Sequence, residues 1–262
     1  MLGAIAGDVV GSVYEGAAPP GKTFPLFSPN SRFTDDTVMT VAVASALRLG
    51  REYAAELHRW GRGYPDAGYG GLFRHWLRSD EPRPYGSFGN GSAMRVSAVA
   101  WACDDLDSVL AEAKRSAEVT HDHPEGIRGA QAVACALFLA RTGTSKAGIR
   151  ACLEADFGYD CSPTLDALRA ASRFDATCQG TVPAAAVAFL ASEGVEDAIR
   201  NAVSLGGDAD TLACIAGALA EAFHGGVPDA LAAEALARLD PPLRRETDAF
   251  LTEYVHPRLQ PR

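Results

Sequence analysis

The chain has 262 residues, a length that allows one large domain or two small ones and removes roughly three quarters of the unfolded surface from water. Apolar residues make up 47% and charged residues 22%, an ordinary globular mixture that excludes disordered, collagen-like and low-complexity chains. The 24 lysines and arginines against 33 aspartates and glutamates give a formal net charge of −9, which argues against a general binder of DNA or RNA but allows a nucleotide-sized ligand.

The beginning of the chain has no basic region and reaches Asp8 within its first turns, so a signal peptide is not expected. No apolar run approaches the roughly 18 residues of a membrane span. The six cysteines form no CxxC pair, and five lie among apolar or helix-forming neighbours, which predicts reduced core thiols in a cytoplasmic protein. Cys178 is the exception, because its loop-like surroundings are where a thiol can be reactive.

Alanine-rich helical patterns dominate the chain, and no stretch alternates β-branched and aromatic residues as a strand does. Helices are predicted over 38–49, 92–102, 109–119, 126–141, 182–191 and 211–223. The stretches 16–33 and 61–91 are rich in glycine, proline and aromatic residues, and they are predicted as long functional loops. No composition shift divides the chain, so we expect an all-α protein with one compact domain over residues 1–262.

Residues 16–23 match the phosphate-loop pattern GxxxxGK[ST] letter for letter. A phosphate loop requires a preceding strand and a helix that begins at its lysine, whereas Pro25 and Pro29 follow Lys22 closely and break any helix there. Two prolines inside the motif also remove amides that would hold phosphate. We interpret the match as accidental.

Two acidic segments stand directly before apolar helical patterns. The first is Thr-Asp-Asp-Thr at 34–37, and the second is Gly-Gly-Asp-Ala-Asp-Thr at 206–211. Capping explains one Thr or Asp in each, because an N-cap side chain accepts amide hydrogen bonds and the helix dipole favours a negative charge. Capping does not require two acids after a glycine pair, so the second segment favours a ligand site.

If the segments meet, Asp35, Asp36, Asp208 and Asp210 form a cluster of four carboxylates. Two unit charges about 4 Å apart repel by on the order of 4 kcal/mol at an effective dielectric constant of about 20, so convergence requires cations or protonation. Two divalent ions balance the charge. An oxygen-only donor set favours Mg²⁺ first and Mn²⁺ next, and it disfavours zinc. The sequence alone does not show that the segments meet.

These two segments resemble the metal-binding signatures of the ADP-ribosylglycohydrolase family, and further blocks resemble that family in the same order. They are the Gly-Asp segment ending in Glu at 7–15, the glycine-rich block at 86–95, the Thr-His segment at 120–124, and a later segment at 182–184 and 189–190. The resemblance covers nearly the whole chain, about residues 3–225.

The resemblance implies an all-α orthogonal helical bundle that carries two Mg²⁺ ions, or Mn²⁺, and cleaves the glycosidic bond between ADP-ribose and an acceptor. The implied metal ligands are Thr34, Asp35, Asp36, Asp208, Asp210 and Thr211. The implied catalytic residues are Asp36 and Glu15. Glu15 is expected to be a general acid or base and a gate over the metal site, against the alternative of a solvated loop residue.

The glycine-rich block is expected to hold a diphosphate through its amides and the positive end of the following helix, although a plain turn also explains it. The implied substrate-binding residues are Gly86, Ser87, Phe88, Gly89, Asn90, Gly91 and His121. His123 can simply cap the helix that begins near Pro124, and Met94 and Arg95 are taken as structural.

The acceptor stays open among serine-linked, arginine-linked and acetylated ADP-ribose, with a lean toward the serine linkage from the Glu15 position and the 182–184 block. Two other functions are left open: an ADP-ribose-binding module without turnover, and another two-metal nucleotide hydrolase that acts at phosphorus. No segment indicates a membrane, a nucleic acid or a partner protein, and we expect a monomer.

Overall fold

The computed structural model describes residues 1–17 and 20–259, and within them all regular structure is helical. The described residues contain no strand, and a single β-bridge joins Gly89 to Thr177. The prediction of an all-α fold is therefore confirmed.

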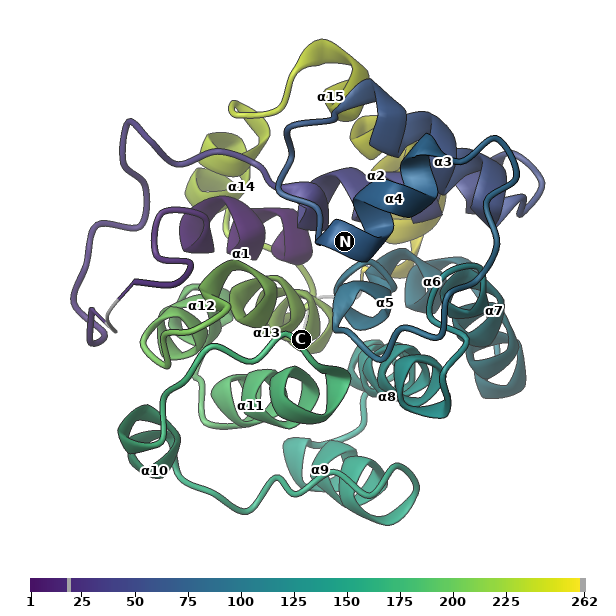
Figure 1. Ribbon diagram of the computed structural model, residues 1–262. Coiled ribbons are helices and arrows are strands. Elements are labelled where there is room, and N and C mark those ends of the chain that lie inside the picture. Colours follow the sequence, from purple (N-terminus) through teal and green to yellow (C-terminus); the bar gives the residue numbers. More distant parts are fainter. Residues whose placement is uncertain (18–19, 260–262) are drawn as a thin grey trace.

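One half of the molecule is built around α13 (Ala209–His224), which is buried from Ala209 to Ala222. Four helices pack around it in Figure 1: α1 (Leu2–Gly11), α8 (Pro124–Arg141), α11 (Cys178–Leu190) and α12 (Val195–Val203). The apolar side chains of α13 have no exposed face, which explains why this helix carries alanine, leucine and isoleucine all round.

The contact between α1 and α13 is a seam of glycines, and Figure 1 shows the purple α1 beside the green α13. A Cβ added at Gly3 would lie 2.2 Å from the carbonyl oxygen of Gly217, and one at Gly7 would lie 2.0 Å from that of Ala213. A Cβ at Gly11 would lie 2.4 Å from the Cα of Asp210. The absence of side chains at these positions, spaced four apart, lets the backbones touch and fixes α1 beside the N-terminus of α13.

The other half of the molecule is built around α2 (Asp35–Arg48), which contacts α3 (Tyr53–Gly63), α6 (Ser97–Ala102), α15 (Pro241–Phe250) and α1. The one-turn helix α5 (Gly91–Met94) joins the halves through contacts with α2, α8 and α13, and α7 (Leu106–Glu118) packs on α8. The remaining elements are α4 (Gly71–Arg78), α9 (Lys146–Ala155), α10 (Leu165–Ala170), α14 (Asp229–Leu236), the π-helix Leu251–Val255 and the 3₁₀-helix His256–Arg258.

Two predicted elements need correction. The predicted helix 92–102 is divided into α5 and α6, because the chain turns at Arg95 and buries that side chain against Ser116 and Thr120. The predicted loop 61–91 contains α4 and the end of α3, because three apolar side chains of α4 at helical spacing pack into the core. They are Phe73, Trp76 and Leu77.

No helix begins at Lys22, and its ammonium group pairs with Asp197 at 2.6 Å. Residues 18 and 19 of the phosphate-loop match lie outside the described residues. None of the helices in 1–17 and 20–259 is both long and apolar enough to cross a membrane.

Candidate active site

The N-terminus of α2 is capped without the help of its two aspartates. Thr34 is the N-cap, and its hydroxyl oxygen accepts a hydrogen bond from the Asp36 amide at 3.3 Å. Asp8, fully buried on α1, accepts further hydrogen bonds from Thr34 and from the amide of Thr37, the latter at 3.0 Å. The carboxylates of Asp35 and Asp36 are therefore not needed for capping.

The N-terminus of α13 follows two glycines in the left-handed region, Gly206 at φ 71° and Gly207 at φ 70°. A Cβ at Gly207 would also lie 2.5 Å from the carbonyl oxygen of Arg173. Asp208 occupies the N-cap position, but its side chain makes no capping hydrogen bond. Instead, Asp208 Oδ2 accepts a hydrogen bond from the side-chain amide of Asn90 at 2.6 Å.

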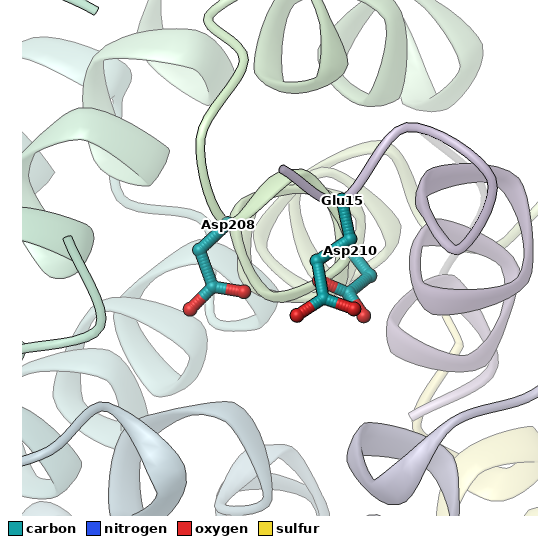
Figure 2. Close-up of side chains that lie close together, drawn as sticks. All are labelled: Glu15, Asp208 and Asp210. Atoms are coloured by element: carbon teal, nitrogen blue, oxygen red, sulfur yellow. The ribbon is translucent and has the colours of Figure 1, made fainter. Parts of the chain in front are cut away.

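The two acidic helix starts meet. The hydroxyl of Thr211 donates to Asp36 Oδ2 at 3.2 Å, which joins α13 to α2 directly. Carboxylate oxygens of Glu15, Asp208 and Asp210 lie within 4.8 Å of one another, and Figure 2 shows these side chains directed into one space. A cavity of about 370 Å³ has Glu15 and five of the six predicted metal ligands in its wall. These ligands are Asp35, Asp36, Asp208, Asp210 and Thr211.

Burial and mutual repulsion make this cluster unfavourable as bare carboxylates. Burial, followed by the charge of Asp8, raises the pKa of Asp35 to about 7. Burial and the charge of Asp210 raise the pKa of Asp36 well above its usual range, and burial and Asp208 do the same to Asp210. Burial and the charge of Asp208 also raise the pKa of Glu15, which lies on the exposed side of the cluster. The cluster is stable when cations or protons neutralise it.

The glycine-rich segment lines the same cavity, with Asn90 hydrogen-bonded to Asp208, and three of its amides are already used within the protein. The amide of Gly86 donates to Asp122 at 2.6 Å, that of Gly89 to the Ser87 hydroxyl at 3.1 Å, and that of Asn90 to the Ala176 carbonyl at 2.8 Å. Within the described residues the amides of Ser87, Phe88 and Gly91 donate to no acceptor. Of these three residues, Ser87 and Gly91 line the cavity, so their amides are the ones that a ligand there can use.

Residues 1–259 match the family model described as ADP-ribosylglycohydrolase. The chain belongs to the ADP-ribosylglycohydrolase family. The ADP-ribosylhydrolase ARH3 of mouse is 28% identical to it over 306 residues, which cover 86% of this chain and 82% of the mouse protein. The human ADP-ribosylhydrolase ARH3 is 29% identical to this chain. The alignment covers 86% of this chain and 84% of the human protein.

A solved structure described as an ADP-ribosylglycohydrolase-related protein complex superposes on this chain with a TM-score of 0.72 at 29% identity. The superposition covers 95% of this chain and 94% of the solved chain. The resemblance drawn from the sequence is thus confirmed. As an ADP-ribosylglycohydrolase, this chain is a hydrolase that acts on ADP-ribose glycosidic bonds. Its acidic cluster of Glu15, Asp208 and Asp210 is a set that can hold a metal ion.

The other predicted site residues of this ADP-ribosylglycohydrolase divide into two groups. Five line the cavity: Ser87, Gly89, Asn90, Gly91 and His121. Thr34, Gly86 and Phe88 are not in the cavity wall. Phe88 is 47% exposed, and its ring lies edge-on to His123, 5.4 Å away between centroids. His123 caps α8 by accepting from the Glu125 amide at 3.1 Å, as its position predicts.

The structure adds residues to the site that the sequence reasoning had not assigned to it. Asp8 supports α2 from α1, and Tyr85, Arg95 and Phe174 line the cavity. The segment 7–15 contained a signal for Asp8, because Gly7-Asp8 resembles the Gly-Asp pair of the family's N-terminal segment. Phe174 is 57% exposed in a segment without helical pattern, and no sequence signal marked it.

The prediction of a loop around Cys178 is wrong, and the structure does not favour a reactive thiol there. The residue begins α11, is fully buried, and its thiol donates to the carbonyl oxygen of Gly89 at 3.1 Å. Burial raises the pKa of this thiol to about 11, so the reactive thiolate is not formed at neutral pH. The thiol is part of the packing that holds the glycine-rich segment on α11.

Proposed function

We propose that this chain uses two Mg²⁺ ions to cleave the bond between the anomeric carbon of ADP-ribose and an acceptor. One observation carries the proposal: the acidic starts of α2 and α13 line the same cavity as Glu15 and the glycine-rich segment. The cavity thus combines hard oxygen ligands with free amides suited to a diphosphate.

The residues present fit two divalent ions. Asp35, Asp36, Asp208 and Asp210 supply four negative charges, and two Mg²⁺ ions balance them. Asp36 Oδ1 is buried and has no hydrogen-bond partner among the described residues, as expected of an atom that ligates a cation. Thr211 adds a hydroxyl oxygen to the set, and Thr34 adds another if its hydroxyl turns from Asp8. Mn²⁺ is the alternative ion, because its preference for oxygen ligands is similar.

When bound, the ions would act as Lewis acids that hold the ribose hydroxyls and lower the pKa of a water. The chain's own residues complete the chemistry. Glu15 lies at the exposed side of the cluster with a raised pKa, which suits it to take a proton from water or give one to the leaving group. The carboxylates, Asp36 among them, stabilise the positive charge of the oxocarbenium-like transition state.

The diphosphate of ADP-ribose is assigned to the glycine-rich segment. The free amides of Ser87 and Gly91 in the cavity wall support this role, and no lysine is needed, because backbone amides bind phosphate by themselves. The helix behind the segment is the single turn α5, so its dipole contributes little and the amides carry the binding.

The acceptor we propose is a serine side chain, ahead of an arginine side chain or the acetyl ester of O-acetyl-ADP-ribose. This preference rests on the resemblance at Glu15 and at 182–184. We further propose that the chain acts as one domain and as a monomer in the cytoplasm, where its six unpaired cysteines stay reduced.

The test is mass-spectrometric detection of ADP-ribose released from serine-linked, arginine-linked and acetylated substrates, each with Mg²⁺ and with EDTA. The expected result is Mg²⁺-dependent release that is fastest for the serine linkage and absent in Asp208→Asn. Lys22→Ala serves as the matched control, because Lys22 pairs with Asp197 away from the cavity. Tight binding of ADP-ribose without release would indicate a binding module, and release of phosphate or AMP would indicate hydrolysis at phosphorus.

A further inference from the structure

Arg95 is a buried cation in the wall of the cavity, and it is 1% exposed. Its Nη2 donates to the Ser116 carbonyl oxygen at 2.7 Å and to the Thr120 hydroxyl oxygen at 2.9 Å. Its Nε has no hydrogen-bond partner among the described residues, and none of their carboxylates forms an ion pair with it. A buried charge that nothing balances is costly, so an anionic ligand in this cavity would be favoured.

The Thr120 hydroxyl links this cation to His121. It is fully buried, and its oxygen lies 2.7 Å from His121 Nδ1 as well as 2.9 Å from Arg95 Nη2. Because a guanidinium only donates, the hydroxyl accepts from Arg95 and has its own hydrogen left to donate to Nδ1.

The reverse arrangement leaves a donor without an acceptor. If Nδ1 carried the hydrogen and donated to Thr120, the hydroxyl hydrogen would have no acceptor in a site closed to solvent. Leaving a buried donor unpaired is unfavourable enough to select the tautomer of His121 that carries its hydrogen on Nε2. Burial and the charge of Arg95 also lower the pKa of His121 well below its usual range and keep the ring neutral.

The Nε2 side of the ring lies over the glycine-rich segment. A Cβ added at Gly91 would lie 3.1 Å from His121 Nε2, and one at Gly89 would lie 3.7 Å from it. No acceptor for Nε2 is found among residues 1–17 and 20–259. The Nε2–H group is therefore available to a ligand that lies against these glycines.

We propose that Arg95 and Thr120 are positioning residues that hold His121 as the neutral Nε2–H tautomer, which donates one hydrogen bond to a phosphate oxygen over Gly89 and Gly91. The phosphate follows from the unbalanced charge of Arg95 and the free amide of Gly91. The identity of the ligand depends on the proposed function, whereas the tautomer of His121 is a property of the protein without ligand.

The tautomer is read from long-range ¹H–¹⁵N correlation spectra of the full chain with ¹⁵N-labelled histidine at pH 7, without ligand. The His121 signals are identified by their loss in His121→Gln. The expected pattern is an unprotonated Nδ1 and a protonated Nε2. Thr120→Val keeps the shape of the side chain at position 120 but removes its hydroxyl, so His121 should then be a mixture of the two tautomers. Thr120→Ser should restore the original pattern, and Thr142→Val, at an exposed threonine outside the cavity, should not change it.

Calorimetric titration with ADP-ribose tests the consequence for binding. Thr120→Val should bind about tenfold more weakly, the loss expected when one hydrogen bond is no longer aligned, and Thr120→Ser should recover most of the affinity. In turnover, the loss should affect KM more than kcat.

Three results would overturn the proposal: a protonated Nδ1 in the unaltered protein, an imidazolium at pH 7, or a Thr120→Val protein with unchanged ADP-ribose affinity. The first two need no variant, so a failure of Thr120→Val to fold does not prevent the test. A chain with the expected tautomer but no Mg²⁺-dependent release contradicts the proposed function alone. A chain that releases ADP-ribose but has the opposite tautomer contradicts this inference alone.

Discussion

Asp8 reaches Thr34 with both of its carboxylate oxygens: Oδ2 accepts the Thr34 amide at 2.9 Å, and Oδ1 accepts the Thr34 hydroxyl at 2.7 Å. Oδ2 also accepts from the amide and hydroxyl of Thr37. The carboxylate of α1 thus holds the first turn of α2 and, with it, the positions of Asp35 and Asp36. Asp8 therefore positions these two proposed metal ligands through their backbone.

Asp8→Asn should therefore damage the site without removing a cavity-lining residue. The amide that replaces one oxygen cannot accept, so buried donors of Thr34 or Thr37 lose their acceptor, at a cost of about 2–4 kcal/mol in unfolding free energy. Urea denaturation at saturating Mg²⁺ measures the loss, since the ions then balance the other carboxylates. Thr37→Val removes one of the donors and should cost less. Unaltered stability and turnover in Asp8→Asn would show that Asp8 has no such role.

Asp210→Asn should have opposite effects with and without metal. In EDTA the substitution removes one of the repelling carboxylates, so the Tm should rise. In Mg²⁺ the variant loses a ligand, so the rise in Tm on adding the ion should shrink and turnover should fall by at least about a hundredfold. Asp197→Asn is the control, because it removes an acid paired with Lys22 on the surface. Equal changes in EDTA and Mg²⁺ would contradict the metal assignment.

The stability of the metal-free protein should rise on acidification. The pKa of Asp35 is raised to about 7 in the folded protein, above its unfolded value, so the folded state takes up a proton as the pH falls through that range. The free energy of unfolding in EDTA should therefore increase between about pH 8 and 6.5. In Mg²⁺ the gain should disappear, because protons then compete with the ion. Identical pH profiles in the two buffers would count against a cation site.

Gly7→Ala should open the seam between α1 and α13. The added Cβ would lie 2.0 Å from the Ala213 carbonyl oxygen, so one backbone must move, and the cost should be about 3 kcal/mol. Mg²⁺ affinity should fall with stability, since the movement shifts Asp8 relative to Asp210. Gly63→Ala in α3 meets no atom within 4 Å and should not be destabilising. Two variants of equal stability would show that the seam tolerates a methyl group.

Local patterns were sufficient to predict the helical class and the acidic residues that line the cavity. The apolar period marked α8 and α13, and the paired acids of 34–37 and 206–211 marked the candidate cation site, because these signals lie within a few consecutive residues. The surroundings of Arg95 and Cys178 could not be predicted, because they come from distant segments: Arg95 donates to Ser116 and Thr120, and Cys178 donates to Gly89. Burial by another helix, which decides both cases, leaves no mark in the neighbouring sequence.

The same limit applies to the meeting of the acidic segments. Asp36 and Thr211 touch because α1 bridges their helices, and α1 can do so because Gly3, Gly7 and Gly11 have no side chains. A glycine repeat has several structural explanations, so its meaning became clear only once its partner helix was known.

The glycine seam also sets the order in which the protein can mature. Asp8 and Asp210 are about 200 positions apart in the chain, so α1 must wait for α13 to emerge from the ribosome before it has a surface to pack against. The carboxylates reach one another only after that late long-range contact has formed. The divalent ions that we propose for these carboxylates would therefore bind late, to a scaffold that is already assembled, rather than nucleate folding.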